Sequence, residues 1–304
     1  MTTRAMGPGA GWDWLKQAVN LGSHRPMAIF GGAALVFGVV VVVALVLALL
    51  LGTAVSTLQA GGTGSMLASF AITIPVLMIM ATLLVGYLRL LDAVENTRDA
   101  SATDVFAGFS DWPTALRIFG FMLVMTLVQN LILGGLVAVL APDVGAWYMQ
   151  VLQNPAGTPA QVPTLPQGFG MVFAVFWVVG LFGYAVQAIG LGQIALAKRG
   201  VGGALVDGLS GAAKNLLPLL VLMLAMIAAA IVIGLVLLLL LFVVGLLAKV
   251  VGTWLLFVVG IPLYLAVVMA MIVVSFGVMY FMWRDVCAGT AGVRAIHDET
   301  RLEL

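Results

Sequence analysis

The side chains that could carry chemistry inside this chain's long apolar stretches are few, and the candidates are neutral amides. They are Gln129, Asn130, Gln187 and Gln193. At a rise of about 1.5 Å per residue, Gln129 and Gln187 both fall in the middle of a membrane core roughly 30 Å thick. They could bond to each other across a helical hairpin. Two roles stay open for such a bond, interhelical packing or part of a solute-binding site.

The apolar stretches contain no ionisable side chain. Asp, Glu, Lys, Arg and His are absent from residues 26–88, 118–142, 167–197, 215–248 and 250–283. Ion-coupled transporters keep such groups inside the bilayer, and intramembrane metalloenzymes and aspartyl proteases need His or carboxylate side chains there. A serine hydrolase at Ser69 or Ser275 would have no base in the spans. We therefore expect no catalytic residue, no metal site and no cofactor.

The composition indicates a membrane protein. Of 304 residues, 63% are hydrophobic and 8% are charged, whereas about 25% of a soluble domain is charged. A soluble fold of this size could not hide so much apolar surface. The apolar runs are unbroken, which indicates helices and not an outer-membrane barrel. With a net charge of +1 and no densely basic segment, nucleic acid is not an expected partner.

The sequence predicts one all-α membrane domain over residues 1–304, in which six transmembrane helices form three hairpins. The predicted spans cover about 26–51, 66–88, 114–140, 169–197, 216–248 and 254–283. Residues 1–10 are expected to be loose. The connection 141–167 contains five prolines and is expected to be irregular and extended.

A short amphipathic helix is predicted ahead of each hairpin, at about 11–22, 103–112 and 201–213. Such helices lie in the membrane interface with their apolar face toward the acyl chains. Their expected anchors are Trp12, Trp14, Val105, Phe106, Phe109, Trp112, Leu205 and Leu209. The three units of helix plus hairpin resemble an internal triplication. The alternative is that any six-helix protein has interfacial segments between its hairpins.

Basic residues occur on alternate connections. They lie before the first span, between the second and third, between the fourth and fifth, and in the tail, with Lys249 as the exception. This positive-inside pattern predicts a multi-pass protein with both termini in the cytoplasm. Small residues at Ala34 and Gly38, and at Ala230 and Gly234, are typical of packing faces within a chain or between copies.

The stretches Gly86–Phe109 and Gln193–Ser210, with Asn215–Pro218, resemble a broad bacterial group. It comprises the membrane domain found ahead of some glycerophosphodiester phosphodiesterases and its largely uncharacterised stand-alone six-span relatives. The resemblance covers nearly the whole chain in soft patterns, and it implies a protein of the bacterial inner membrane. The tail after Trp283 is too short for a phosphodiesterase domain, so no catalytic residue is carried over.

Two functions stay open. The first is a non-enzymatic membrane protein whose amphipathic helices organise the lipid bilayer or dock a partner, which is another protein or a second copy of the chain. The second is a carrier or channel for an uncharged or lipid-like solute. That alternative depends on the amide side chains in the membrane and on the glycine-rich fourth span.

Overall fold

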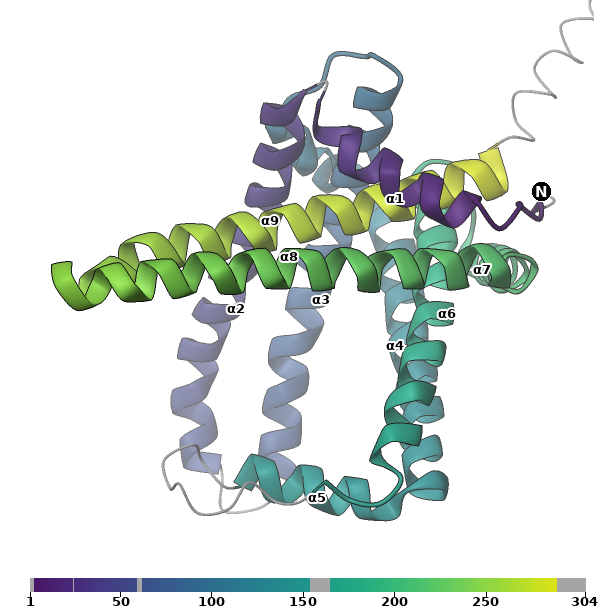
Figure 1. The fold of residues 1–304 in the computed structure, drawn as a ribbon. Coiled ribbons are helices and arrows are strands. Elements are labelled where there is room, and N and C mark those ends of the chain that lie inside the picture. The colour runs from purple at the N-terminus through teal and green to yellow at the C-terminus, as the bar shows by residue number, and fades with distance from the viewer. Residues whose placement is uncertain (1–2, 24, 59–61, 154–164, 289–304) are drawn as a thin grey trace, which may run out of the picture.

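A computed structural model describes residues 3–23, 25–58, 62–153 and 165–288, and every regular element in these ranges is a helix (Figure 1). In chain order they are α1 (Ala10–Asn20), η1 (Leu21–Ser23), α2 (Pro26–Leu58), α3 (Gly62–Glu95), η2 (Ala102–Ser110), α4 (Trp112–Leu140), α5 (Pro142–Gln153), α6 (Phe169–Ala195), α7 (Val201–Lys214), α8 (Leu216–Val251), α9 (Trp254–Trp283) and η3 (Arg284–Ala288). The elements η1 and η2 are 3₁₀ helices, and η3 is a π-helical turn.

Among the described residues, six helices are long and apolar enough to cross a membrane: α2, α3, α4, α6, α8 and α9. The chain is therefore an all-α, multi-pass membrane protein, as its composition predicted. The predicted spans fall on these six helices. Helices α2 and α3 extend further than expected, to Leu58 and from Gly62, so much of the stretch between the first two predicted spans is helical.

The connection 141–167 contains a helix, α5, where the sequence predicted an irregular loop. Pro142 stands at its first position, where the missing N–H is harmless, and Asp143 lies in its first turn. Val144 packs beside Val172 in a small second core. The ring of Trp147 lies edge-on to Phe169, with 5.5 Å between the centroids. Helix α5 thus runs across the ends of the upright helices in Figure 1.

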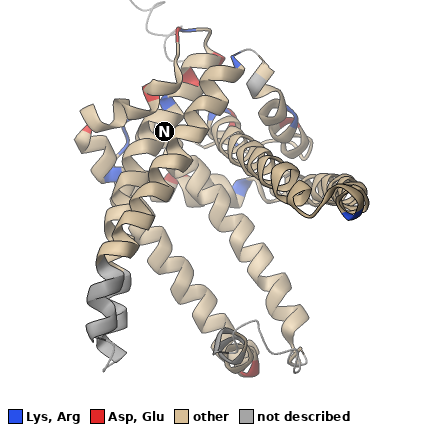
Figure 2. Cartoon of the chain, turned by 90° about the vertical axis from the view of Figure 1, so that its left-hand side faces the viewer, with Lys and Arg blue, Asp and Glu red and all other residues tan. Residues whose placement is uncertain are grey.

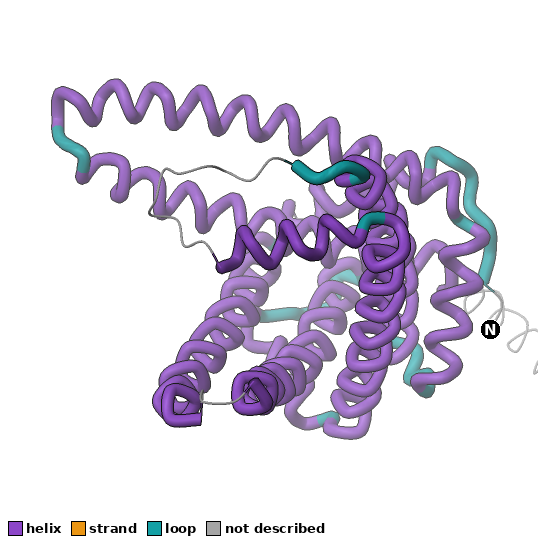
Figure 3. Tube along the Cα trace, turned by 90° about the horizontal axis from the view of Figure 1, so that it is seen from below, coloured by secondary structure: helices purple, strands orange, loops and turns teal. Residues whose placement is uncertain are grey.

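The three hairpins α2–α3, α4–α6 and α8–α9 meet at one end and diverge from it (Figures 1 and 2). The α8–α9 hairpin crosses the other four spans steeply and projects away from them (Figure 3). Among the described residues, every Asp, Glu, Lys and Arg except Asp143 and Lys249 lies where the hairpins meet. We call this the charged end and its opposite the far end.

The main core also lies at the charged end. Trp14, Tyr87, Phe121 and Phe281 are its largest fully buried aromatic side chains. Toward the far end the spans expose their side chains, as at Leu131, which is 75% exposed. Lipid must therefore cover most of the surface of the spans.

Each amphipathic segment packs on a neighbouring hairpin. Element η2 contacts α2 and α3, α7 contacts α6, and α1 contacts α8 and α9. The second and third segments thus rest on the hairpin that precedes them in the chain, and α1 closes the ring by resting on the last one. Glycines permit this approach: a Cβ on Gly86 would lie 2.0 Å from the Val105 carbonyl oxygen, and one on Gly108 would lie 1.9 Å from that of Thr82.

Candidate membrane-interface site

Gln129 of α4 and Gln187 of α6 are hydrogen-bonded across their hairpin. Gln187 Nε2 donates to Gln129 Oε1 at 3.1 Å. Gly183 leaves room for this pair, because a Cβ there would lie 2.1 Å from Gln129 Nε2. Asn130 instead donates to the carbonyl of Thr126, one turn back in its own helix, at 2.8 Å. Of the four candidate amides, the structure thus bonds Gln129 and Gln187 to each other and leaves Asn130 outside that pair.

Gln193, the fourth amide, lies at the charged end and not near the membrane middle. It is fully buried and donates from Nε2 to Asp207 Oδ2 at 3.3 Å. Asp207 is only 4% exposed, and Arg199 Nε donates to the same carboxylate oxygen at 3.1 Å. A buried carboxylate needs such partners. Sequence reasoning missed Asp207, because its burial on α7 is revealed only by the structure.

Arg89 joins three elements at the charged end. Its Nη2 donates to Asp111 Oδ2, and its Nε donates to the Ala195 carbonyl at the end of α6 at 3.3 Å. Asp111 caps α4, where its carboxylate accepts from the Thr114 hydroxyl at 2.9 Å. The hydrogen bond from Arg89, with those from Thr114, holds the pKa of Asp111 below its usual value.

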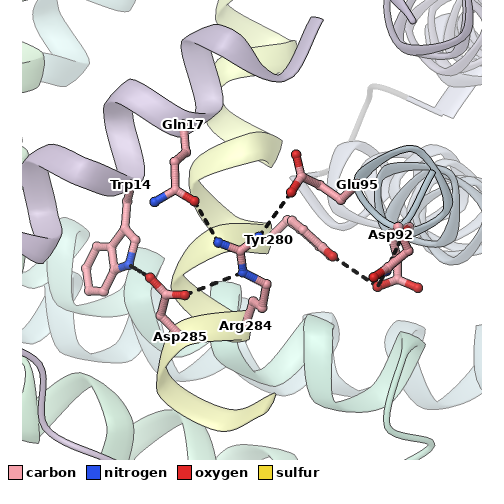
Figure 4. Close-up of polar contacts among 8 residues, drawn as sticks. Trp14, Gln17, Asp92, Glu95, Tyr280, Arg284 and Asp285 are labelled. Atoms are coloured by element: carbon pink, nitrogen blue, oxygen red, sulfur yellow. Dashed lines mark hydrogen bonds and ion pairs between the residues drawn. The ribbon is translucent and has the colours of Figure 1, made fainter. Parts of the chain in front are cut away.

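A second polar group joins the beginning and the end of the chain (Figure 4). Arg284 Nη1 donates to Glu95 Oε2 at 3.1 Å, and its Nη2 donates to Gln17 Oε1 at 2.6 Å. The indole N–H of Trp14 donates to Asp285 Oδ2 at 3.0 Å. These bonds tie α1 and α3 to the residues that follow α9.

A third polar link, between Tyr280 and Asp92, lies beside the Arg284 group (Figure 4). The Tyr280 hydroxyl donates to Asp92 Oδ1 at 3.0 Å, so α9 is bonded directly to α3. Asp92 also accepts from Arg98, which follows the end of α3. The ends of spans from different hairpins are therefore held together by charged side chains at this end.

The described part of the N-terminal segment is fixed, contrary to the expectation for residues 1–10. Asn215, which precedes α8, accepts from the Met6 backbone N–H at 2.7 Å and donates to the Arg4 carbonyl at 3.0 Å. Lys214 Nζ donates to the Thr3 carbonyl at 2.9 Å. Composition could not reveal this, because the bonds join residues about two hundred positions apart.

Each amphipathic segment has one apolar face against the protein and another that is exposed. Two of the predicted membrane anchors, Trp14 and Val105, lie on the face against the protein. Trp14 and Val105 are fully buried, whereas Trp12 is 54% exposed. In α1 the buried face contains Trp14, Leu15 and Ala18, which pack on the α8–α9 hairpin. Because Trp14 also bonds to Asp285, it is a core residue rather than a membrane anchor.

The second segment owes its two faces to its 3₁₀ geometry, in which side chains at i and i+3 lie in line. Val105 and Gly108 point inward and are buried. Phe106 and Phe109 form the outer line and are 37 and 48% exposed, and Trp112, the first residue of α4, is 49% exposed. The sequence predicted an α-helix that placed Val105 with these aromatic residues, and the tighter helix separates it from them.

In the third segment, α7, Leu209 is half exposed and Leu205 is partly buried. Val206 adds to the outer face with 65% exposure. We define the outer faces as Trp12 and Val19, then Phe106, Phe109 and Trp112, then Val206 and Leu209. All three stand at the charged end.

The arrangement offers exposed apolar faces for contact with lipid or protein rather than a cluster of reactive side chains. No group of three His, Cys, Asp or Glu residues suited to a metal occurs within the described ranges. Gly38 and Gly234, predicted as packing positions, face open space. No family model, curated protein or solved structure matches the chain. The similarity to the membrane domain of glycerophosphodiester phosphodiesterases therefore stays a prediction.

Proposed function

We propose that this protein is a non-enzymatic component of a bacterial inner membrane that organises lipids of the cytoplasmic leaflet. The supporting observation is that each amphipathic segment buries one face on a hairpin and leaves a second apolar face exposed at the charged end. A face of this kind at a membrane interface inserts among acyl chains. Three such faces at the charged end, where the hairpins meet, would hold and order the lipid between the diverging hairpins.

The proposed orientation places the charged end and both termini in the cytoplasm. It is supported by the distribution of basic residues: within the described ranges only Lys249, in the last turn of α8 at the tip of the α8–α9 hairpin, lies away from the charged end. Cytoplasmic connections carry the excess of Lys and Arg in membrane proteins.

We also propose that the three units arose by triplication. Thr97 and Lys198 are the only non-glycine residues with positive φ in the described part of the chain, at +54° and +53°. Each follows the second span of its hairpin and precedes an arginine, Arg98 or Arg199, that pairs with an aspartate. The packing of α1, η2 and α7 on successive hairpins supports the same origin.

Probes on the outer faces test the lipid proposal. An environment-sensitive fluorophore attached to cysteine at Phe109 or Leu209 should be quenched by nitroxide-labelled phospholipids in nanodiscs. The matched control is cysteine at Asp99, whose side chain is fully exposed at the same end and should stay in water. The native chain, whose Cys287 is buried, measures background labelling. Full water exposure at both outer-face positions would contradict the proposal.

The carrier alternative has the amide pair as its support. Because Gln129 and Gln187 satisfy each other, they are better suited to interhelical bonding than to binding a solute. Solute flux or lipid scrambling in reconstituted vesicles that disappears in a folded Gln129→Leu variant would favour the carrier over the proposed function. If a soluble protein covers Phe109 and Leu209 instead of lipid, the same probes would resist the nitroxide lipids.

A further inference from the structure

We infer that Arg117 and Lys198 bind the phosphate group of an anionic phospholipid at the charged end. This inference rests on the proposed function and names the class of lipid that the protein holds. Arg117 Nη1 donates to the Lys198 backbone carbonyl at 3.2 Å, so the guanidinium lies directly at the turn that ends α6. Both residues are exposed.

The backbone at Lys198 explains why the Arg117 guanidinium lies at this turn. Its φ of +53° is left-handed and ends the helix, and the next N–H, of Arg199, bonds back to the Gln193 carbonyl at 2.9 Å. The chain then turns into α7, which contacts α4 near Gly120. Arg117, on the second turn of α4, is thereby brought to the same place as Lys198.

These two cations differ from the other basic residues of the charged end. Six of those pair with carboxylates: Lys16, Arg25, Arg89, Arg98, Arg199 and Arg284. Arg4 and Lys214 bond to oxygens of the chain itself. Within the described ranges, Arg117 and Lys198 are paired with no carboxylate. Two neighbouring like charges without an acid provide a site for an anion.

The surroundings favour a lipid phosphate over a free one. Trp112, which begins α4, is 49% exposed, and Leu116, which directly precedes Arg117, is 48% exposed. Beyond Arg117, Leu123 and Val124 continue an exposed apolar surface toward the far end. A tryptophan and basic side chains at the head-group level, followed by an apolar helix surface, suit a phospholipid whose chains lie along α4.

Arg117 has a competing structural role, because an arginine that bonds to a helix's last carbonyls also stabilises that helix end. Glutamine at this position removes the charge, and its amide nitrogen lies two bonds nearer the backbone than Nη1, so the bond to the Lys198 carbonyl is lost as well. The side chain of Lys198 is not required for that bond, which uses its backbone oxygen. Lys198→Gln therefore tests the charge alone, and Arg117→Gln tests the charge together with that bond.

The experiment measures which lipids the full chain retains. The protein is purified in detergent micelles with equal amounts of phosphatidylglycerol and phosphatidylcholine, and the bound lipids are quantified after gel filtration. We expect native protein to prefer phosphatidylglycerol. Each single variant should lower that preference about fivefold and the double variant about 25-fold. Lys16→Gln removes a charge that is already paired with Asp13 at the same end, and should leave the preference unchanged.

An unchanged preference in the folded double variant would overturn the inference, with circular dichroism and elution volume as the checks of folding. Displacement of phosphatidylglycerol by millimolar inorganic phosphate would also overturn it, because the site would then recognise free phosphate. The fluorophores at Phe109 and Leu209 separate the two proposals. If lipid quenches them while native protein shows no preference, this inference fails and the proposed function stands.

Discussion

Arg284 Nη1 lies 3.1 Å from Glu95 Oε2, so the residue that follows the last span is paired with the last residue of the second. The same guanidinium bonds to Gln17 of α1 and lies 4.7 Å over the ring of Phe281. One side chain thus connects the beginning, the first hairpin and the last hairpin of the chain. The first and last hairpins are thus joined at the charged end.

Replacing Arg284 with Gln should therefore destabilise the whole fold. The change removes the ion pair with Glu95 and most of the bonds to Gln17 and Asp285. Since Arg284 and Glu95 keep 34% and 31% of their side-chain surface exposed, we expect a loss of about 1–2 kcal/mol. Thermal unfolding in detergent measures it. Arg25→Gln, which breaks a pair with the fully exposed Asp99, should leave the midpoint unchanged, and equal effects would argue against a hub at Arg284.

Acid should weaken the link between Arg89 and Asp111. The pKa of Asp111 is lower in the folded protein than in the unfolded chain, chiefly because of its bond with Arg89. Its contribution to stability is complete above the ordinary carboxyl pKa and is lost as the pH falls through the lowered folded value. Asp111→Asn should therefore lower stability at neutral pH and reduce the acid dependence of the unfolding midpoint. Asp13→Asn, at an exposed pair, is the control; an acid profile that Asp111→Asn leaves unaltered would contradict the assignment.

The contact between α3 and η2 should not tolerate a methyl group. In Gly86→Ala the new Cβ would meet the Val105 backbone at 2.0 Å, and a backbone atom cannot rotate away. We expect a loss of about 3 kcal/mol or more, seen as reduced yield of folded protein on gel filtration. Gly134→Ala on α4 has nothing within 4 Å and should be neutral or slightly stabilising. A well-folded Gly86→Ala variant would show that η2 does not rest on α3 as described.

The bond between Gln129 and Gln187 should contribute to stability and not to transport. Gln129→Leu removes an interhelical bond and leaves the partly buried amide of Gln187 without its partner, so we expect a loss of about 0.6–2 kcal/mol. Asn130→Leu breaks only a bond within α4 and should have little effect. The unfolding midpoints of the two variants are compared in the same detergent. Identical midpoints would contradict a stabilising role for the bond between Gln129 and Gln187.

Much of the fold could be predicted because each span is an unbroken apolar run. Helix α5 was missed, since the prolines around it outweighed the fact that Pro142 opens a helix easily. The second apolar face of the amphipathic segments was missed for a different reason. Sequence spacing cannot distinguish a 3₁₀ turn from an α-helix over so few residues, and this choice decides whether Val105 faces protein or lipid.

The pairs at the charged end could not be predicted, because they join distant parts of the chain. Nothing near Asp207 in the sequence announces that Gln193 and Arg199 both reach its carboxylate. Likewise Gly192 is required because the ring of Trp283 lies against it, which only the arrangement of α6 and α9 reveals. The amide pair was predicted correctly because Gln129 and Gln187 stand at matching depths of one hairpin.

The side of the membrane on which the charged end lies is decided most directly by labelling single cysteines in intact spheroplasts with a membrane-impermeant maleimide. Cysteine at Gly252, in the turn between α8 and α9, should react from outside, and cysteine at Asp99 should react only after the membrane is opened. That pair of results would place the three outer faces in the cytoplasmic leaflet. Labelling of Asp99→Cys in sealed spheroplasts, with Gly252→Cys protected, would contradict both the orientation and the proposed function.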